Sequence, residues 1–306
     1  MSEPRVNIVL AAYNGEKHIR TQLDSLLEQT YPNIIITVRD DGSTDHTVEI
    51  VREYVMKYPE KIVLLEPDGE NLKCPGSFYR ILEKCEKADY YAFCDQDDVW
   101  EPDKIKWAVE KLEEEEQEGK LYLSSYDYYT EDGAFIRHFP PQNPEIPLRE
   151  VLYHTPGSGF TIVFDEWIRK KFVLETRPGK EMHDRWLIRA AVCFGKVIYD
   201  PRSTARHIRH EEAVTVEDAG NKNLLIHFIQ NELLSDVAVE AKQDLTYFYN
   251  VFQKDLKEKD RKLIEIFVRE HGGVKNWFQK VFYKKRLRSR LLGEIALRML
   301  FFIGKI

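Results

Sequence analysis

The fold is decided by residues 34–51, which read IIITVRDDGSTDHTVEIV. The run from Ile34 to Val38 is short, apolar and rich in β-branched residues, which is typical of a buried strand. Apolar residues then recur at Val48, Val51 and Val55, the spacing of one face of a helix. Carboxylates, a glycine and good N-cap residues lie between the two patterns, so this stretch predicts a strand, a tight turn and a helix.

The same alternation extends along the first hundred residues. Strand-like apolar runs occur at residues 6–11, 62–65 and 90–93, and helix-like apolar spacing separates them. This βαβαβαβ order predicts the α/β class, with a doubly wound, mostly parallel sheet covered by helices on both faces. In such sheets, ligands bind outside the carboxyl ends of the strands.

Beyond Trp100 the pattern changes, first to mixed helices and shorter strands and then, from about residue 221, to helices alone. We therefore expect an α/β domain over residues 1–215 and a helical C-terminal region over residues 216–306.

Composition narrows the class of protein further. The 306 residues are 43% hydrophobic and 32% charged, which allows a sizeable core and argues against disorder. Four cysteines without a C-x-x-C pair indicate neither a zinc ribbon nor a disulfide framework, and they favour a reducing compartment. The N-terminus lacks the pattern of a signal peptide, and no apolar run is long enough to span a bilayer. These features predict a cytoplasmic protein.

Charge is distributed unevenly along the chain. Residues 275–306 hold nine Lys or Arg and one acid, a net charge of +8, which leaves −15 for the rest of the chain. The acidic body argues against nucleic acid as a partner. The tail also contains Trp277, Phe278, Phe282, Tyr283, Phe301 and Phe302. Basic amphipathic helices with such aromatics bind anionic membranes, although a helix docked on the acidic body and a dimerisation helix are alternatives.

Two acidic strings follow predicted strands. In the first, residues 40–45, Ser43 or Asp45 can cap the next helix, but capping does not explain the adjacent pair Asp40 and Asp41. A carboxylate facing the crevice there can accept a hydrogen bond from the imide N–H of uracil or thymine.

The second acidic string is DQDD at residues 95–98. Three carboxylates in four residues repel one another unless a cation neutralises them, and oxygen ligands alone suit Mg²⁺ or Mn²⁺. A solvated acidic turn is the alternative, which the flanking Phe93 and Trp100 make less attractive.

Two later strings contain further candidates. Asp184 begins an apolar helical pattern, so it is either an ordinary first-turn acid or a general base that removes a proton from an attacking hydroxyl. Residues 206–210 read RHIRH, and their side chains can bind diphosphate oxygens or a metal, although a single histidine there is often structural.

Taken together, four strings resemble family 2 glycosyltransferases, which have the GT-A fold: AAYNG at 11–15, QTYP at 29–32, DDGSTD at 40–45 and DQDDVW at 95–100. The longer string FCDQDDVW at 93–100 is similar to the bacterial rhamnosyltransferase branch. The resemblance implies a GT-A catalytic domain over residues 1–215, with a nucleotide-sugar-binding half at about 1–100 and an acceptor half at about 101–215.

The resemblance also implies roles for single residues. Ala11, Tyr13 and Asp41 hold the donor nucleobase, while Asp95 and Asp97 form the metal-binding D-x-D motif. Asp184 is the catalytic base, because a similar His-Asp-Trp string has this role in the rhamnosyltransferase branch. The other expected site residues are Gln96 and Lys73 on the donor side, His210 at the metal, and Asp98, Trp100, Gly159, His183, Arg185 and Trp186 on the acceptor side or behind it.

The chain departs from the family pattern in three places. One is the loop NLKCPGS at residues 71–77, where the family usually has a Gly-containing loop that opens a helix near the donor; Pro75 and Gly76 keep the loop character, and Lys73 can face a phosphate. The family commonly has a Tyr-Arg-x-His string that aligns by its histidine with His210, but here His207 replaces the tyrosine and Ile208 the arginine. Arg185 stands where an aromatic residue is common, so acceptor recognition can differ.

These expectations describe an inverting glycosyltransferase that uses Mg²⁺ or Mn²⁺. It moves a sugar, with L-rhamnose from dTDP-β-L-rhamnose favoured, to a lipid-linked saccharide at the inner face of the plasma membrane during polysaccharide synthesis. The alternatives are a UDP-hexose donor, a sugar nucleotidyltransferase and a non-catalytic nucleotide-sugar-binding protein. A homodimer is an open alternative for the oligomeric state.

Overall fold

Two compact units make up the chain. The computed structural model describes residues 3–140, 144–176, 178, 181–209, 236–269 and 273–306. The first unit comprises Met1–Pro144 and Gly157–His210, and the second comprises Glu145–Pro156 and Glu211–Ile306. The sequence did not indicate that residues 145–156 cluster with the C-terminal region; the boundary near residue 215 stays a prediction.

The first unit is built around one mixed sheet. Among the described residues, nine strands join it in the order β3-β2-β1-β4-β8-β6-β9-β5, with β7 beside β6. The strands are β1 (Val6–Ala12), β2 (Ile34–Asp40), β3 (Ile62–Leu64), β4 (Tyr90–Cys94), β5 (Asp98–Trp100), β6 (Lys120–Thr130), β7 (Phe135–Phe139), β8 (Ile162–Asp165) and β9 (Lys196–Arg209).

The parallel part of the sheet is the part predicted from the βα alternation. Strand β1 pairs in parallel with β2 and β4, and β2 pairs in parallel with β3. Beyond β4 the sheet is mixed, because β8 runs antiparallel to both β4 and β6, whereas β6 and β9 are parallel. The predicted α/β class is confirmed. The antiparallel strands come from the part of the chain beyond Trp100, for which the sequence predicted a mixture of helices and shorter strands.

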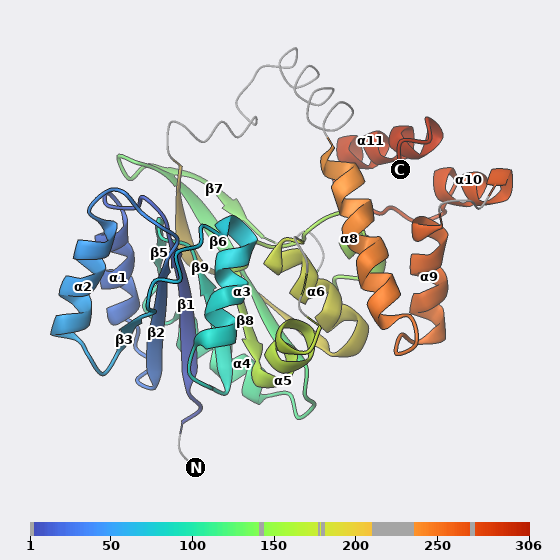
Figure 1. Ribbon diagram of the computed structural model, residues 1–306. Helices are drawn as coiled ribbons and strands as arrows, with labels where there is room; N and C mark the ends of the chain where they lie inside the picture. The colour runs from blue at the N-terminus through green and yellow to red at the C-terminus, as the bar shows by residue number, and fades with distance from the viewer. Residues whose placement is uncertain (1–2, 141–143, 177, 179–180, 210–235, 270–272) are drawn as a thin grey trace. The chain divides into compact units, whose positions relative to one another are not determined.

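Helices cover both faces of this sheet (Figure 1). They are α1 (Ile19–Leu27), α2 (Thr47–Lys57), α3 (Lys73–Lys84), α4 (Lys104–Glu113), α5 (Glu166–Arg169) and α6 (His183–Phe194), with the short turns η2 (Gly159–Thr161) and η3 (Lys170–Leu174). Alternate β1 residues, Val6, Ile8 and Leu10, join one buried cluster with apolar residues of α1, α2 and α4. Side chains alternate along a strand, so the opposite face of the sheet is left for α3, α5 and α6.

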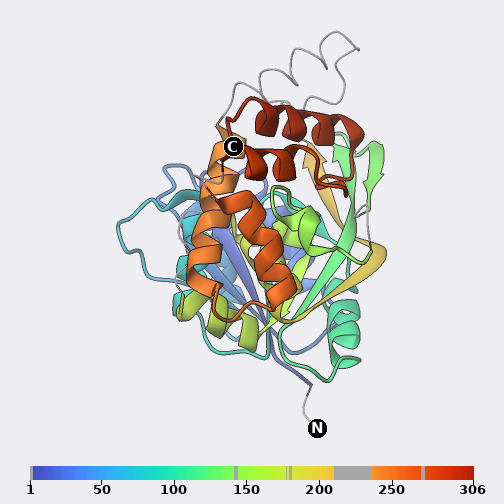
Figure 2. The same ribbon diagram turned by 90° about the vertical axis from the view of Figure 1, so that its right-hand side faces the viewer.

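The second unit consists of helices. They are η1 (Leu148–Val151), α8 (Val237–Phe252), α9 (Glu258–Val268), α10 (Gly273–Val281) and α11 (Leu291–Phe302). Its core includes Tyr153, Phe267 and Phe301, whose ring centroids lie 5.5 to 6.1 Å apart. Helices α10 and α11 lie side by side (the red ribbons in Figure 2). Within the part of the chain that is described, no helix combines the length and the apolarity needed to cross a bilayer.

Candidate active site

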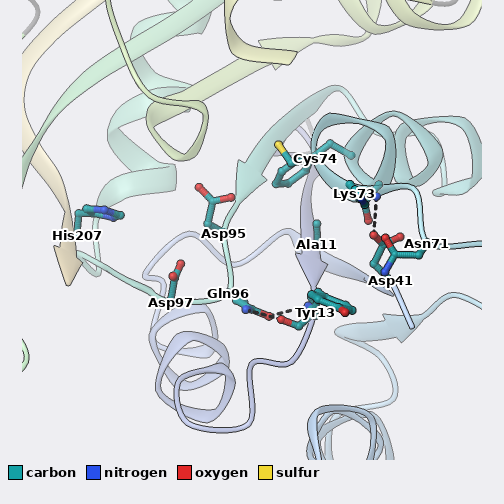
Figure 3. A pocket seen from close by; sticks show the side chains of 13 residues that line it. Ala11, Tyr13, Asp41, Asn71, Lys73, Cys74, Asp95, Gln96, Asp97 and His207 are labelled. Atoms are coloured by element: carbon teal, nitrogen blue, oxygen red, sulfur yellow. Dashed lines mark hydrogen bonds between the residues drawn. The ribbon is translucent and has the colours of Figure 1, made fainter. Parts of the chain in front are cut away.

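A cavity of about 570 Å³ opens at the carboxyl ends of β1, β2 and β4 (Figure 3). This is the edge where an α/β sheet binds its ligands, and the size suits a small molecule. The cavity is lined by Ala11, Ala12, Tyr13, Asp41, Asn71, Lys73, Cys74, Ser77, Phe78, Asp95, Gln96, Asp97 and His207. Seven of the residues expected at the donor and metal sites therefore lie together, although they come from four separate stretches of sequence.

Asp41 is buried and held in a fixed orientation at one end of this cavity. Its carboxylate accepts the backbone N–H groups of Leu72 at 2.9 Å and Lys73 at 2.7 Å, and it pairs with the Arg39 guanidinium. Arg39 also donates to Asp68 at 2.8 Å and to the Glu70 carbonyl at 2.8 Å. This network joins the end of β2 to the loop that precedes α3, and so determines which way Asp41 faces.

Asp40, the neighbouring carboxylate, contacts the backbone of the turn that follows β2. It accepts the backbone N–H groups of Gly42 and Ser43, both at 3.0 Å, and so closes the turn after β2. Gly42 takes a φ of +90° in this turn, a conformation that L side chains rarely adopt. Asp41, the member of the acidic pair that the family resemblance assigned to the donor, lines the cavity, and Asp40 is not among the lining residues.

Gln96 connects the loops that follow β1 and β4. Its side-chain amide accepts the backbone N–H of Tyr13 at 2.8 Å and donates to the Tyr13 carbonyl at 2.9 Å. A Cβ atom at Gly15 would lie 2.3 Å from the Gln96 amide oxygen, so only glycine fits there without displacing Gln96. Gln96 therefore positions Tyr13, whose ring is half exposed beside the cavity.

Asp95 and Asp97 lie on the side of the cavity that also holds the His207 ring (Figure 3). Burial raises the pKa of Asp95, and the negative charges of Asp98 and Asp97 raise it further. Such a concentration of carboxylates costs stability unless a cation neutralises it, and carboxylate oxygens are ligands that Mg²⁺ and Mn²⁺ accept.

A divalent cation therefore fits this donor set. Among the described residues, no three acidic, histidine or cysteine side chains stand close enough together to hold a metal by themselves. In the usual Mg²⁺ site, one or two carboxylates act together with substrate phosphates. His210, the third expected ligand, lies outside the described residues.

Asp98 and His207 form a pair that the sequence did not predict. They face each other across β5 and β9, and the His207 Nδ1 lies 2.6 Å from an Asp98 oxygen. Burial lowers the pKa of His207, but the hydrogen bond and charge of Asp98 outweigh it, so the pKa is raised overall. His207 lines the cavity while Asp98 is buried behind it. The pairing of β5 with β9 brings these two residues together although they lie 109 positions apart in the sequence. A local sequence motif could not have predicted this contact.

Asp184 lies in the first turn of α6, beside the cavity rather than among the residues that line it. The neighbouring residue His183 contacts two residues that line the cavity, Cys74 at 3.9 Å and the Phe78 ring at 4.3 Å between centroids. The charge of Asp184 raises the pKa of Asp95 and of Cys74. Burial raises the pKa of Asp184 to about 6, against the opposing effects of the Arg185 backbone N–H and charge. A carboxylate with such a pKa is ionised at neutral pH and is a better proton acceptor than an ordinary aspartate.

The residues around Asp184 are packed tightly. The His183 ring lies between Phe78 and Phe93, with centroids 4.3 and 4.4 Å away, and burial lowers its pKa to about 3. A Cβ atom at Gly159 would come within 2.3 Å of the His183 Nε2 atom. Neutral His183 and Gly159 therefore fix the start of α6 by packing, and with it the position of Asp184.

The other residues expected near the acceptor are held inside the first unit. Trp186 is fully buried and its indole N–H donates to the Phe172 carbonyl at 2.7 Å. Trp100 is buried beneath the Lys104 ammonium, which lies 4.2 Å from its ring centre. Arg185 donates to Glu181 at 3.1 Å. Any influence of Trp186 and Trp100 on a substrate would therefore act through packing.

Comparisons with known proteins place the chain in a family. Residues 7–176 match the family described as "Glycosyl transferase family 2". The chain is 41% identical over 186 residues to "dTDP-rhamnosyl transferase RfbG" of Shigella flexneri, a match that covers 58% of this chain and 63% of that protein. It is 32% identical over 162 residues to the "UDP-Glc:alpha-D-GlcNAc-diphosphoundecaprenol beta-1,3-glucosyltransferase WfaP" of Escherichia coli, covering 52% and 60%. Both matches span less than two thirds of the relative's length.

Solved structures show the same fold at low sequence identity. The mannosyltransferase PcManGT from Pyrobaculum calidifontis, in complex with GDP-Man and Mn²⁺, has a TM-score of 0.55 at 15% identity, covering 93% of this chain and 89% of that one. S. aureus TarS 1-349 in complex with UDP-GlcNAc also has a TM-score of 0.55, at 17% identity, covering 98% and 91%. The expected GT-A-like fold is thus confirmed. Because the family match runs from β1 to beyond η3 and spans more than half of the chain, the protein belongs to glycosyl transferase family 2.

Proposed function

We propose that this chain is an inverting, metal-dependent glycosyltransferase whose favoured donor is dTDP-β-L-rhamnose. The observation that carries the proposal is the cavity in which Asp41, Asp95 and Asp97 meet, with Asp184 beside it. The relative from Shigella flexneri, described as a dTDP-rhamnosyl transferase, supports the choice of donor.

The nucleobase end of the cavity is the part around Ala11, Tyr13 and Asp41. Asp41 uses one carboxylate oxygen for the Lys73 N–H and shares the other between Leu72 and Arg39. A carboxylate has about four acceptor positions, so room is left to accept the imide N–H of thymine or uracil. The half-exposed Tyr13 ring offers a face against which the base can stack.

The diphosphate end is the part around Asp95, Asp97 and His207. A cation held by Asp95 and Asp97 would neutralise charge on the leaving diphosphate. Lys73, exposed at the rim of the cavity, adds a positive charge on the donor side. We assign His207 to the diphosphate as well, with Asp98 accepting its Nδ1 hydrogen and so directing Nε2 away from the Asp98 carboxylate.

The acceptor reacts on the side of Asp184. This carboxylate takes the proton of the acceptor hydroxyl as that oxygen attacks the anomeric carbon. The bond from the anomeric carbon to the diphosphate oxygen breaks in the same step, and its electron pair leaves with the nucleoside diphosphate. A single displacement of this kind inverts the anomeric configuration and needs no covalent enzyme intermediate.

For the acceptor, we propose a lipid-linked saccharide at the inner face of the plasma membrane, which would make the enzyme cytoplasmic and peripheral to the membrane. The relative from Escherichia coli, whose description names a diphosphoundecaprenol-linked sugar, supports this class of acceptor. The same description favours the alternative donor, a UDP-hexose.

A panel of donors tests the proposal and separates the two donors. Purified protein is incubated with dTDP-rhamnose, UDP-glucose, UDP-galactose or UDP-N-acetyl sugars, with Mg²⁺ or Mn²⁺ or with a chelator, and nucleotide release is measured. We expect the fastest release from dTDP-rhamnose, abolished by the chelator. Faster nucleotide release from a UDP-hexose would support the alternative donor. Nucleotide release at the same rate with the chelator present would contradict the proposed dependence on a divalent cation.

The Asp97→Ala variant tests the cation site separately. We expect weaker binding of dTDP in the presence of Mn²⁺ by calorimetry, while the exposed control Asp132→Ala binds as the unchanged protein does. Unchanged affinity of Asp97→Ala would remove Asp97 from the metal site.

A further inference from the structure

The two last helices of the second unit expose an unusually apolar surface. On α11, Leu292, Ile295, Met299 and Phe302 lie three or four positions apart, which is one helical face, and each is at least 44% exposed. The opposite face, with Ala296, Leu297, Leu300 and Phe301, is buried in the core. A helix that is apolar all round is normally buried all round, so the exposed face of α11 calls for a partner.

Helix α10 extends this face. Val274 and Phe278 are exposed four positions apart, and Phe282 follows at 64% exposure. The Trp277 indole N–H donates to the Phe302 carbonyl at 3.0 Å, and the two rings lie 5.4 Å apart. Phe278 and Phe282 stack at 5.6 Å. The exposed sides of the two helices are thereby joined into one surface, called here the α10–α11 face.

Positive charges border this face, and the loop between the helices carries most of them. Lys275, Lys284, Lys285, Arg286 and Arg290 are exposed. Glu294, the one acid of residues 273–306, is 6% exposed and turned inward. It accepts the backbone N–H groups of Leu287 and Arg288, both at 2.8 Å. The segment therefore presents positive charge outward while its negative charge is used to hold the loop.

The loop is also held by Arg298. This guanidinium pairs with Glu294 and donates to the carbonyls of Lys280 and Lys285, each at 2.8 Å. The cations of residues 284–286 are thus presented on a fixed loop rather than on a freely moving tail.

We infer that the α10–α11 face is a membrane-binding surface whose occupant is a bilayer containing anionic lipid. Its exposed aromatic and aliphatic side chains would enter the boundary between headgroups and acyl chains, and the surrounding lysines and arginines would meet lipid phosphates. Charge complementarity favours this occupant over a second copy of the chain, because two such surfaces would bring like charges together. The inference depends on the second unit alone and stands apart from the choice of donor.

Vesicle binding by the full chain, without donor or metal, tests the inference. Wild-type protein is sedimented with vesicles of phosphatidylcholine alone, or of phosphatidylcholine and phosphatidylglycerol in equal parts, at low and high salt. We expect binding to the anionic vesicles that weakens as salt increases, and little binding to the neutral ones. No binding to the anionic vesicles, or equal binding to both kinds, would overturn the inference.

Matched variants locate the binding surface. The triple variant Lys284→Gln, Lys285→Gln, Arg286→Gln removes three cations and is expected to lower the partition coefficient about a hundredfold, from roughly fivefold per charge. Its control neutralises Lys254, Lys257 and Lys259, which are exposed around the turn from α8 to α9, and is expected to bind as wild type. An equal loss in the control would contradict the assignment to the α10–α11 face.

A second set tests the apolar part. The second triple variant carries Leu292→Gln, Ile295→Gln and Met299→Gln, and it leaves the buried face of α11 intact. We expect it to weaken the part of vesicle binding that persists at high salt. Met56→Gln, at an exposed position on α2, is the control. Circular dichroism verifies that each variant is folded. If analytical ultracentrifugation without lipid shows a dimer that this triple variant converts to a monomer, the face is an interface between copies and the membrane assignment is wrong. Nucleotide release from the donor panel is measured without vesicles, so either proposal can fail without the other.

Discussion

Four aspartates in or near the cavity have different surroundings. Asp40 closes a turn, Asp41 is held by Arg39 and two backbone N–H groups, and Asp95 is crowded by other acids. Asp184 is partly buried in the first turn of α6, and this burial raises its pKa to about 6. The chemistry we propose for each residue follows from these surroundings rather than from the residue type.

Asp184→Asn is expected to lower the rate of transfer by at least a thousandfold and to leave donor binding unchanged, because the amide cannot accept the hydroxyl proton. In the unchanged enzyme, Asp184 becomes protonated as pH falls through about 6, so kcat/KM should fall about tenfold per pH unit below that value. The pH profile of sugar transfer checks both points, with Asp132→Asn as the exposed control. Substantial turnover by Asp184→Asn would assign the base to another group.

His207→Ala and Asp98→Asn are each expected to raise the KM for the donor about tenfold, and the double variant to raise it no more than either one. The reason is that Asp98 acts by orienting His207, so the two effects are coupled. His138 and Asp127 form a less buried pair, also 2.6 Å apart, which does not line the cavity; substitutions in this matched control pair should leave the KM for the donor unchanged. If the effects of His207→Ala and Asp98→Asn on the KM add up in the double variant, the two residues act independently.

At the scale of elements, the cavity depends on how loops and helix ends are connected to one another. The loop before α3 is joined to β2 through Arg39, and η2 is joined to α6 through the contact of Gly159 with His183. These connections link segments that are distant in sequence, so each is a place where one substitution affects the whole cavity.

Arg39→Met is expected to reduce the free energy of unfolding by about 3 kcal/mol and to weaken nucleotide binding, because it leaves two carboxylates without their buried partner. Arg39 is the main cause of the lowered pKa of Asp68, about 2 in place of 3.8. The ionised Asp68 carboxylate therefore stabilises the folded protein above pH 4, and this contribution is lost as pH falls from 4 towards 2. In Arg39→Met, the free energy of unfolding should change less with pH between 4 and 2 than in the unchanged protein. Chemical denaturation at several pH values measures it. Arg20→Met, which breaks the exposed and solvent-screened pair with Glu53, should lower the free energy of unfolding far less than Arg39→Met does.

Gly159→Ala is expected to lower both the melting temperature and the transfer rate. The new methyl group would collide with the His183 ring, which Phe78 and Phe93 prevent from moving aside. His183→Ala should partly rescue Gly159→Ala, because the smaller side chain makes room, so the double variant should lose less stability than the two single losses added together. A purely additive result in thermal unfolding would contradict the predicted contact.

At the scale of the whole molecule, every residue that lines the cavity belongs to the first unit, and the α10–α11 face belongs to the second. Chemistry and the proposed membrane contact are therefore assigned to separate units. We therefore expect that substitutions in one unit can disrupt its role and leave the other unit intact.

Deletion of residues 275–306 is expected to destabilise the second unit, because it removes Leu297, Leu300 and Phe301 from the core around Phe267. Hydrogen exchange in α8 and α9 should become faster, while dTDP binding in the first unit should persist. Point variants on the α10–α11 face are thus a cleaner test of membrane binding than truncation. Loss of dTDP binding on truncation would show that the units depend on each other.

The sequence by itself determined the α/β class, the alternation of strands and helices in the parallel part of the sheet, and the acidic strings that follow the strands. These follow from local periodicity and from the rule that strand ends meet at one edge of a sheet. Only the tertiary structure decided that Arg39 and the loop before α3 hold Asp41, that His207 meets Asp98, that Trp186 is core, and that Glu294 is turned inward. Each of these depends on contacts or side-chain directions set by packing between distant segments, which a local pattern of residues does not encode.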